Sequence, residues 1–201
     1  MSPEDRREAA APAAPPEPPE GSVADVFKKA LPGVEMQAIQ GALDVLLVID
    51  RKDAFKVLQV ARNDESLAFD FLRNLSGVDF EAEGFEVVYH LYSYKHRHNV
   101  TIRAKVPRDD ATVQSATTLW EAADWHEREC RDMFGISFEG HPNLVPLLLP
   151  EDMLDHFPLR KDVPLAPLEE WQGEQLGENM ASAGYIPPGS GFDVEPSKEG
   201  E

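Results

Sequence analysis

The sequence predicts the α+β class: a compact domain with a mostly antiparallel sheet and flanking helices, followed by an extended proline-rich arm. The middle of the chain holds a long pair of strand candidates joined by a short turn, which indicates antiparallel pairing. Segments with apolar residues at helical spacing lie between the strand candidates. After residue 141 prolines recur every few positions, which excludes a helix of ordinary length and disfavours a central strand.

Composition divides the chain into four parts. Residues 1–21 are mostly Ala, Pro, Glu and Arg and are predicted to be disordered. Residues 22–138 are predicted to form the α+β domain, and residues 139–168 the extended interaction arm. Residues 169–201 are acidic with scattered large apolar side chains, so this tail either drapes over a surface or stays disordered.

The first elements of the domain are predicted from caps and spacing. Ser22 can cap a short helix, and residues 34–39 and 43–49 are the first strand candidates. Asp50 can cap a helix whose apolar positions have helical spacing: Phe55, Val57, Leu58 and Val60. A second helix is predicted to follow it, on Leu67, Phe69, Phe71, Leu72 and Leu75.

The later elements are the long strand pair and two helices. Residues 85–95 and 99–106 are the strands, and the second alternates apolar with polar side chains, as in a sheet with one solvated face. Residues 115–120 and residues 120–134 are the predicted helices. Gly135 is well placed to end the second of them.

The helix over residues 120–134 separates apolar from charged side chains when they are placed at about 100° per residue. The apolar sector consists of Ala122, Ala123, Trp125, Cys130, Met133 and Phe134, and the opposite side of Asp124, Glu127, Arg128, Arg131 and Asp132. Glu127 with Arg131, and Arg128 with Asp132, are four residues apart and can form ion pairs. Cys130 is predicted to be an inert core thiol.

Glu129 differs from the other charged residues because its direction falls between Trp125 and Met133, inside the apolar sector. A buried carboxylate without a partner is costly or takes up a proton. We therefore expect a cation beside it, either from the chain itself, with Arg160 and Lys161 the nearest candidates, or from another subunit.

The arm is apolar but too rich in proline to fold on itself. Its apolar side chains are Leu144, Val145, Leu147, Leu148, Leu149, Met153, Leu154 and Phe157. Such a segment must lie on its own domain or on a partner, and its length indicates that part of it meets a partner. His141, followed by Pro142, is expected to hold the turn into the arm.

Several runs of residues resemble one known family, the C-type peripheral subunit of NADH-quinone oxidoreductase (respiratory complex I). The chain resembles this family in Glu127, Arg128, Glu129, Asp132, Met133, Phe134, Gly135, Ile136, His141 and Pro142, and again in Pro158, Leu159, Arg160, Lys161 and Asp162. Upstream the pattern continues in Phe71, Leu72, Arg73, Leu75, Val78 and Asp79, and in Phe85, Val87, Val88, Tyr89, His90 and Leu91. The resemblance extends over residues 23–167 and leaves both tails outside.

This resemblance implies a cofactor-free structural subunit of the peripheral arm, with no catalytic or metal-binding residue of its own. FMN, iron-sulfur clusters and quinone would lie in partner subunits, chiefly those of the quinone site and the terminal clusters, while the complex moves electrons from NADH to quinone and pumps protons. The expected interface residues are Trp125, Glu127, Arg128, Glu129, Asp132, Phe134, Gly135, His141, Pro142, Pro158, Arg160, Lys161 and Asp162. The resemblance favours an internal Glu129, with Glu127 or Asp132 facing outward.

Two alternatives remain. The chain could be the equivalent subunit of a related membrane dehydrogenase or hydrogenase complex, since the same motifs are shared among them. It could also be a stand-alone enzyme using Glu129, His126 and His141 as an acid-base set, which requires these side chains to converge in a pocket.

Charge and composition exclude several other functions. The formal net charge of −18 disfavours nucleic acid and a bare anionic bilayer as partners. No apolar run is long enough for a membrane helix, so membrane contact is expected only through the complex, on the cytoplasmic side of a bacterial or archaeal membrane. The single cysteine forms no internal disulfide, the six histidines show no ligand spacing, and nucleotide-binding or esterase motifs are missing.

Overall fold

The computed structural model of the protein describes residues 16–41, 44–150, 153 and 156–163. Its helices are α1 (Val23–Ala30), α2 (Arg51–Asn63) and α3 (Ala123–Phe134), with a short 3₁₀ turn, η2 (Glu81–Glu83). Its strands are β1 (Gln37–Gln40), β2 (Val45–Asp50), β3 (Phe71–Asp79), β4 (Phe85–Ser93), β5 (His98–Val106), β6 (Thr112–Gln114) and β7 (Ser137–Glu139). The predicted tails fall outside the described residues, apart from residues 16–21.

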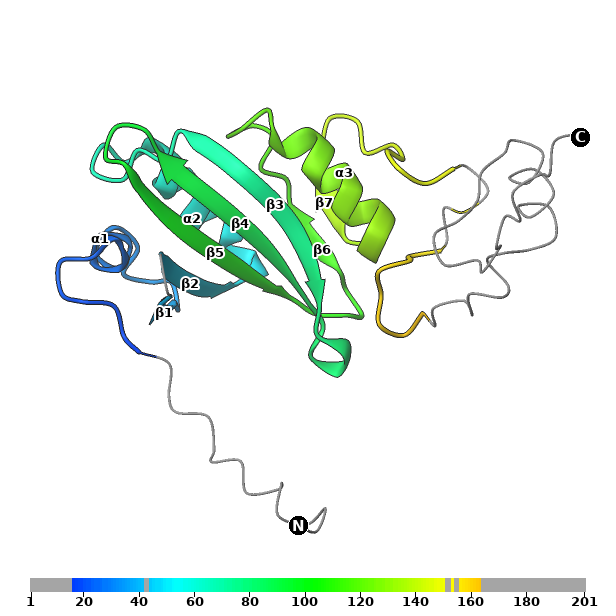
Figure 1. Ribbon diagram of the computed structural model, residues 1–201, viewed down its shortest axis with the longest axis horizontal. Coiled ribbons are helices and arrows are strands. Elements are labelled where there is room, and N and C mark those ends of the chain that lie inside the picture. The colour runs from blue at the N-terminus through cyan, green and yellow to red at the C-terminus, as the bar shows by residue number, and fades with distance from the viewer. Residues whose placement is uncertain (1–15, 42–43, 151–152, 154–155, 164–201) are drawn as a thin grey trace, which may run out of the picture. The chain divides into compact units, whose positions relative to one another are not determined.

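The main sheet has five strands in the order β1-β2-β5-β4-β3 (Figure 1). β3, β4 and β5 form an antiparallel meander, and β1 and β2 form an antiparallel pair. β2 joins β5 in parallel, with Val45 opposite Val100 and Asp50 opposite Lys105. β6 and β7 form a separate parallel pair. The mostly antiparallel α+β fold predicted from the sequence is therefore confirmed.

One face of the main sheet is buried under the helices. The predicted alternation in β5 is confirmed, because Val100, Ile102, Ala104 and Val106 are buried while the residues between them are half-buried or exposed. α2 contributes Ala54, Val57, Leu58 and Ala61 to the same core. Asp50 caps α2 as predicted, since its carboxylate accepts a hydrogen bond from the Lys52 N–H at 2.9 Å.

α3 packs against β3, and Gly77 allows the close approach (Figure 1). A Cβ atom at Gly77 would lie 2.6 Å from the ring of Phe134. The helix ends at Gly135, which has the left-handed φ of 73° that glycine tolerates best. The prediction that Gly135 ends this helix is confirmed.

Two predicted helices are wrong. Leu67, Phe69, Phe71, Leu72 and Leu75 lie in a loop and in strand β3 rather than in a helix. A bulge between Leu72 and Asn74 turns both Leu72 and Leu75 toward the core, so their spacing of three imitates a helix. Residues 115–120 form turns, in which Ser115 uses its side chain to bind Thr117 and the carboxylate of Glu127.

Candidate functional site

The buried face of α3 is not the one predicted. Ala123, Glu127, Cys130 and Phe134 face the core at helical spacing, and Glu127 is 0% exposed. Asp132 is also buried, whereas Glu129 is exposed. The prediction of an internal Glu129 with Glu127 or Asp132 facing outward is therefore wrong. The Cys130 thiol lies in the core as predicted, and burial raises its pKa.

Glu127 is satisfied by neutral hydrogen-bond donors rather than by a cation. Its carboxylate accepts hydrogen bonds from the Ser115 hydroxyl at 2.7 Å and from the Ala116 N–H at 2.6 Å. Burial raises the pKa of Glu127 to about 7, although these two hydrogen bonds oppose the shift. Glu127 thus ties α3 to the preceding turn, which is a structural role.

Asp132 holds the first part of the arm. Its Oδ2 accepts hydrogen bonds from three successive N–H groups, of Leu147 at 2.7 Å, Leu148 at 2.8 Å and Leu149 at 3.3 Å. Arg128 donates to the carbonyl oxygens of Val145 and Pro146, each at 2.9 Å. Residues 145–149 therefore lie along one side of α3.

The ion pairs predicted within α3 take a different form. Neither Glu127 with Arg131 nor Arg128 with Asp132 is paired among the described residues. Arg128 instead approaches Asp124 at 3.9 Å. Arg128 and Asp132 form hydrogen bonds with backbone groups of the arm instead.

His141 holds the turn into the arm, as predicted. Its Nδ1 accepts a hydrogen bond from the Asn143 N–H at 3.0 Å, so the proton lies on Nε2, which donates to the Asp124 carbonyl oxygen at 3.2 Å. The exposed Pro142 follows directly. His141 is fully occupied by these backbone contacts.

The second part of the arm, with Pro158 near its start, docks at the carboxyl end of α3. The Arg160 guanidinium lies 4.2 Å from the ring centre of Phe157 and 5.2 Å from that of Phe85, and its Nε donates to the Phe134 carbonyl at 2.6 Å. A Cβ atom at Gly135 would collide with both Arg160 and Phe157. Arg160 is therefore bound to its own domain and is not the partner of Glu129.

A buried acid that sequence reasoning did not single out as a site residue completes the docking. Asp79, 4% exposed, accepts hydrogen bonds from Arg108 at 2.7 Å and from the Lys161 N–H at 2.9 Å. Burial opposes its ionisation, but these donors outweigh burial and hold the pKa of Asp79 below its usual value. Arg108 also pairs with Asp162 at 2.9 Å. The sequence signal that could have identified Asp79 is its position directly after the apolar residue Val78, at the end of β3.

The outward face of α3 carries Trp125, Glu129 and Met133, four residues apart. Trp125 is 69% exposed and Met133 is partly buried. The predicted apolar sector is thus divided: Ala123, Cys130 and Phe134 face the core, and Trp125 faces solvent. Among the described residues no ion pair reaches Glu129. We call Trp125, Glu129 and Met133 the α3 stripe.

The acid-base set proposed for a stand-alone enzyme does not converge. Glu129 lies on the α3 stripe, whereas the ring of His141 is held on the Asp124 side of the helix. His126 makes no hydrogen bond within the described part of the chain. The same part contains no group of three residues placed to hold a metal ion, and no helix in it is long and apolar enough to cross a membrane.

Comparison with known proteins gives consistent similarities. The family model described as respiratory-chain NADH dehydrogenase, 30 Kd subunit, matches residues 47–169. The C-type subunit of the NADH-quinone oxidoreductase of Roseiflexus sp. (strain RS-1) is 41% identical over 146 residues, covering 72% of this chain and 83% of that protein. The C-type subunit of the F(420)H(2) dehydrogenase of Methanosarcina mazei is 38% identical over 125 residues, covering 62% and 78%. The solved trypsin-resistant fragment of Nqo5 is 30% identical with a TM-score of 0.51, covering 60% of this chain and 98% of the fragment.

Proposed function

Because the chain belongs to the family of the 30 kDa subunit of respiratory-chain NADH dehydrogenase, we propose that its own contribution is positional and that it carries no redox group. The resemblance found in the sequence is confirmed, and the protein is a subunit of an oxidoreductase complex. In the proposed arrangement, partner subunits hold FMN, iron-sulfur clusters and quinone while the complex moves electrons from NADH to quinone and pumps protons. This subunit braces the quinone-proximal subunits on the cytoplasmic side of the membrane.

The observation that carries this proposal is the α3 stripe. The Trp125 indole is 69% exposed beside an exposed carboxylate, so a large amphipathic ring is available to a partner. Trp is among the residues that contribute most to protein interfaces when a partner covers them. We infer that a partner subunit lies over Trp125 and supplies a cation to Glu129.

The arm supports the same proposal. Its backbone is fixed to the domain by Asp132, Arg128 and Asp79, while Val145, Leu148 and Leu159 remain exposed at 43%, 57% and 55%. A segment held by its backbone presents these side chains in a fixed arrangement. We therefore propose that this arm, held on its own domain, meets a partner subunit with its exposed apolar side chains.

Trp125→Ala tests the proposal. In cells expressing the variant, we expect less assembled complex on native gels and about thirtyfold or more weaker association with the partner, since loss of an interface Trp costs about 2 kcal/mol or more. The free energy of unfolding of the isolated variant should be within about 0.5 kcal/mol of the wild-type value. NADH-quinone turnover per assembled complex should stay unchanged.

Tyr94→Ala is the matched control, because Tyr94 is 62% exposed but lies in the turn after β4 rather than on the α3 stripe. It should assemble like wild type. Trp125→Ala complex that assembles fully but loses turnover would contradict a purely positional role.

A second candidate function differs in the electron donor of the complex. The 38% identity to an F(420)H(2) dehydrogenase subunit favours an equivalent position in a related complex. Mild detergent extraction of native membranes, purification on this chain and identification of the recovered subunits distinguishes the two. We expect flavin and iron-sulfur subunits with NADH-quinone activity; a different electron-input module would select the related complex.

A further inference from the structure

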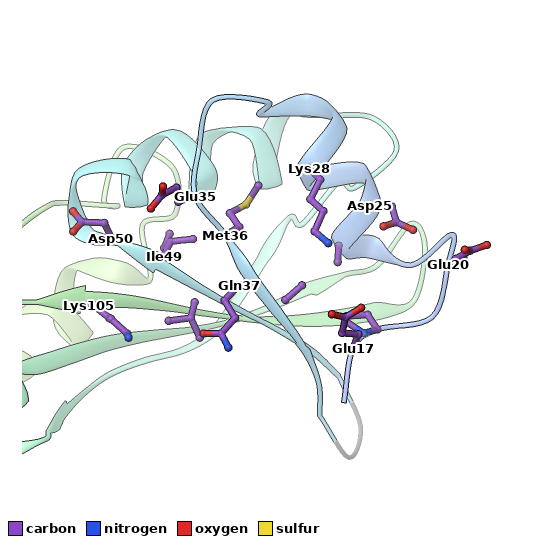
Figure 2. A pocket seen from close by; sticks show the side chains of 14 residues that line it. Glu17, Glu20, Asp25, Lys28, Glu35, Met36, Gln37, Ile49, Asp50 and Lys105 are labelled. Atoms are coloured by element: carbon purple, nitrogen blue, oxygen red, sulfur yellow. The ribbon is translucent and has the colours of Figure 1, made fainter. Parts of the chain in front are cut away.

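A hollow of about 780 Å³ lies beside the free edge of the main sheet (Figure 2). The elements that line it, α1, β1, β2 and β5, are different from α3, which lies at the other side of the sheet beside β3 (Figure 1). The walls of the hollow come from residues 17–20, from α1, from the start of β1 and from the ends of β2 and β5. Apolar side chains, including Met36, Val48 and Ile49, lie among the polar ones. The hollow therefore offers both apolar and charged contacts to an incoming segment.

The outer edge of β1 is open at Ala38, where it faces this hollow. β1 ends the sheet, and its Gln40 N–H donates to the Pro16 carbonyl at 2.7 Å, away from β2. In an antiparallel pair, residues two apart direct their backbone groups to the same side. The N–H and C=O of Ala38 therefore also point away from β2, and no backbone group of the described residues binds them. Pro18 and Pro19 lack the N–H that would extend the pairing.

The charge around the edge selects the occupant. Five carboxylates line the hollow against two ammonium groups: Glu17, Glu20, Asp25, Glu35 and Asp50, with Lys28 and Lys105. Figure 2 shows these side chains around β1. Asp25 and Asp50 already accept backbone hydrogen bonds, whereas Glu17, Glu20 and Glu35 form no ion pair among the described residues. An acidic rim attracts a basic segment and repels nucleic acid or a second copy of this acidic chain.

We propose that the outer edge of β1 and its hollow receive an extended, Lys- or Arg-rich segment of a neighbouring subunit by strand addition. Backbone hydrogen bonds to Ala38 position the segment, and its basic side chains meet Glu17, Glu20 and Glu35. Alternate apolar side chains enter the hollow beside Met36. That the occupant is a neighbouring subunit rests on the proposed function. The preference of this edge for a basic, extended segment rests on the geometry and charge of the hollow alone.

The binding chemistry is tested on the full chain with a labelled eight-residue peptide that alternates Lys and Val, and with its Glu-Val counterpart. By fluorescence anisotropy at low salt, the Lys-Val peptide should bind at least about tenfold more tightly, and its affinity should fall as salt is added. Amide shifts on binding should concentrate at Ala38 and at its neighbours in the hollow, Met36 and Gln37. Equal affinity for both peptides, or shifts elsewhere, would overturn the proposal.

Variants separate the backbone from the charges. Ala38→Pro removes the outward N–H, besides fixing φ at this edge position, and should weaken binding about tenfold or more, whereas Ala38→Val should not. Exchanging the rim acids for Gln at Glu17, Glu20 and Glu35 should weaken binding about tenfold and flatten its salt dependence. The matched control exchanges three exposed acids outside the hollow, Glu83, Glu121 and Glu139, and should leave affinity unchanged. Circular dichroism and melting temperature establish that each variant is folded.

The occupant is tested in the purified complex by zero-length cross-linking of carboxylates to lysines. Cross-links from Glu17, Glu20 or Glu35 to lysines of one partner subunit are the expected result. If subunits co-purify but these acids link to none, this proposal fails while the positional role stands. If nothing co-purifies, the proposed function fails instead. A tenfold rise in peptide affinity after Arg6→Gln and Arg7→Gln would assign the hollow to the chain's own N-terminal segment and overturn the assignment to a partner.

Discussion

At the scale of single residues, the Glu127 carboxyl makes stability depend on pH. Its pKa is about 7 in the folded chain and near the ordinary 4.5 when unfolded, so the folded state holds the extra proton between these values. The stabilisation is complete below pH 4.5 and is lost as pH rises through 7. Its size is about 3 kcal/mol at most, at 1.36 kcal/mol per unit.

Glu127→Gln should remove this dependence, because the amide is neutral and can still accept from the Ala116 N–H. Denaturation from pH 5 to 8 should show wild type losing stability relative to the variant, by about 2.5 kcal/mol at most. Glu129→Gln, exposed on the same helix, should give a curve parallel to that of wild type. Parallel curves for Glu127→Gln as well would contradict the raised pKa.

Residue roles were the least predictable part of the site. Helical projection predicts Trp125 and Met133 in the apolar sector and Glu127 on the charged side, and it predicts a cation beside Glu129. Ser115 and Ala116 supply neutral donors to the buried Glu127 instead, and their approach depends on a turn that no spacing in α3 encodes. His141 was predictable because its contacts are local.

At the scale of elements, long regular patterns were predictable and interrupted ones were not. The alternation in β5 and the Asp50 cap of α2 follow from neighbouring residues. β3 was misread because its bulge breaks the alternation, and the bulge depends on pairing with β4. The conformation of β3 therefore depends on its pairing with β4 rather than on its own sequence pattern.

The contact between β3 and α3 gives a prediction at this scale. Gly77→Ala should destabilise the protein by about 1–3 kcal/mol, because the added methyl would lie 2.6 Å from the Phe134 ring. Gly33→Ala is the control, since nothing lies within 4 Å of its Cβ position. It should be neutral or slightly stabilising in chemical denaturation. Equal effects of the two changes would contradict the close packing.

At the scale of the whole molecule, the arm is joined to the domain through Asp132, 15 residues before Leu147, and through Asp79, 82 residues before Lys161. Composition predicted an extended arm that lies on something, and the described residues place it on its own α3 and β3. The two anchoring carboxylates were not predictable as anchors because their donors are backbone N–H groups, which every residue except proline carries.

Arg108→Ala should loosen the end of the arm. Asp79 would keep its buried carboxylate without the guanidinium, at a cost of about 1–3 kcal/mol, and the Lys161 amide should exchange with solvent faster. Hydrogen exchange over residues 157–163 measures this. Lys56→Ala, on the exposed side of α2, should leave the same amides protected. Unchanged exchange in Arg108→Ala would show that Asp79 holds the arm without help from Arg108.

The parallel pairing of β2 with β5 also shapes how the chain is made. Val45 and Val100 lie side by side although fifty-five positions separate them. On a ribosome, β2 emerges long before its partner, and loop closure of that length is slow. Val45, Leu47 and Ile49 can pair with β1 at once, but on their other side they have no strand neighbour until β5 is synthesised. Chaperones that shield nascent apolar segments therefore have a defined interval in which to act on this protein, before it can join any complex.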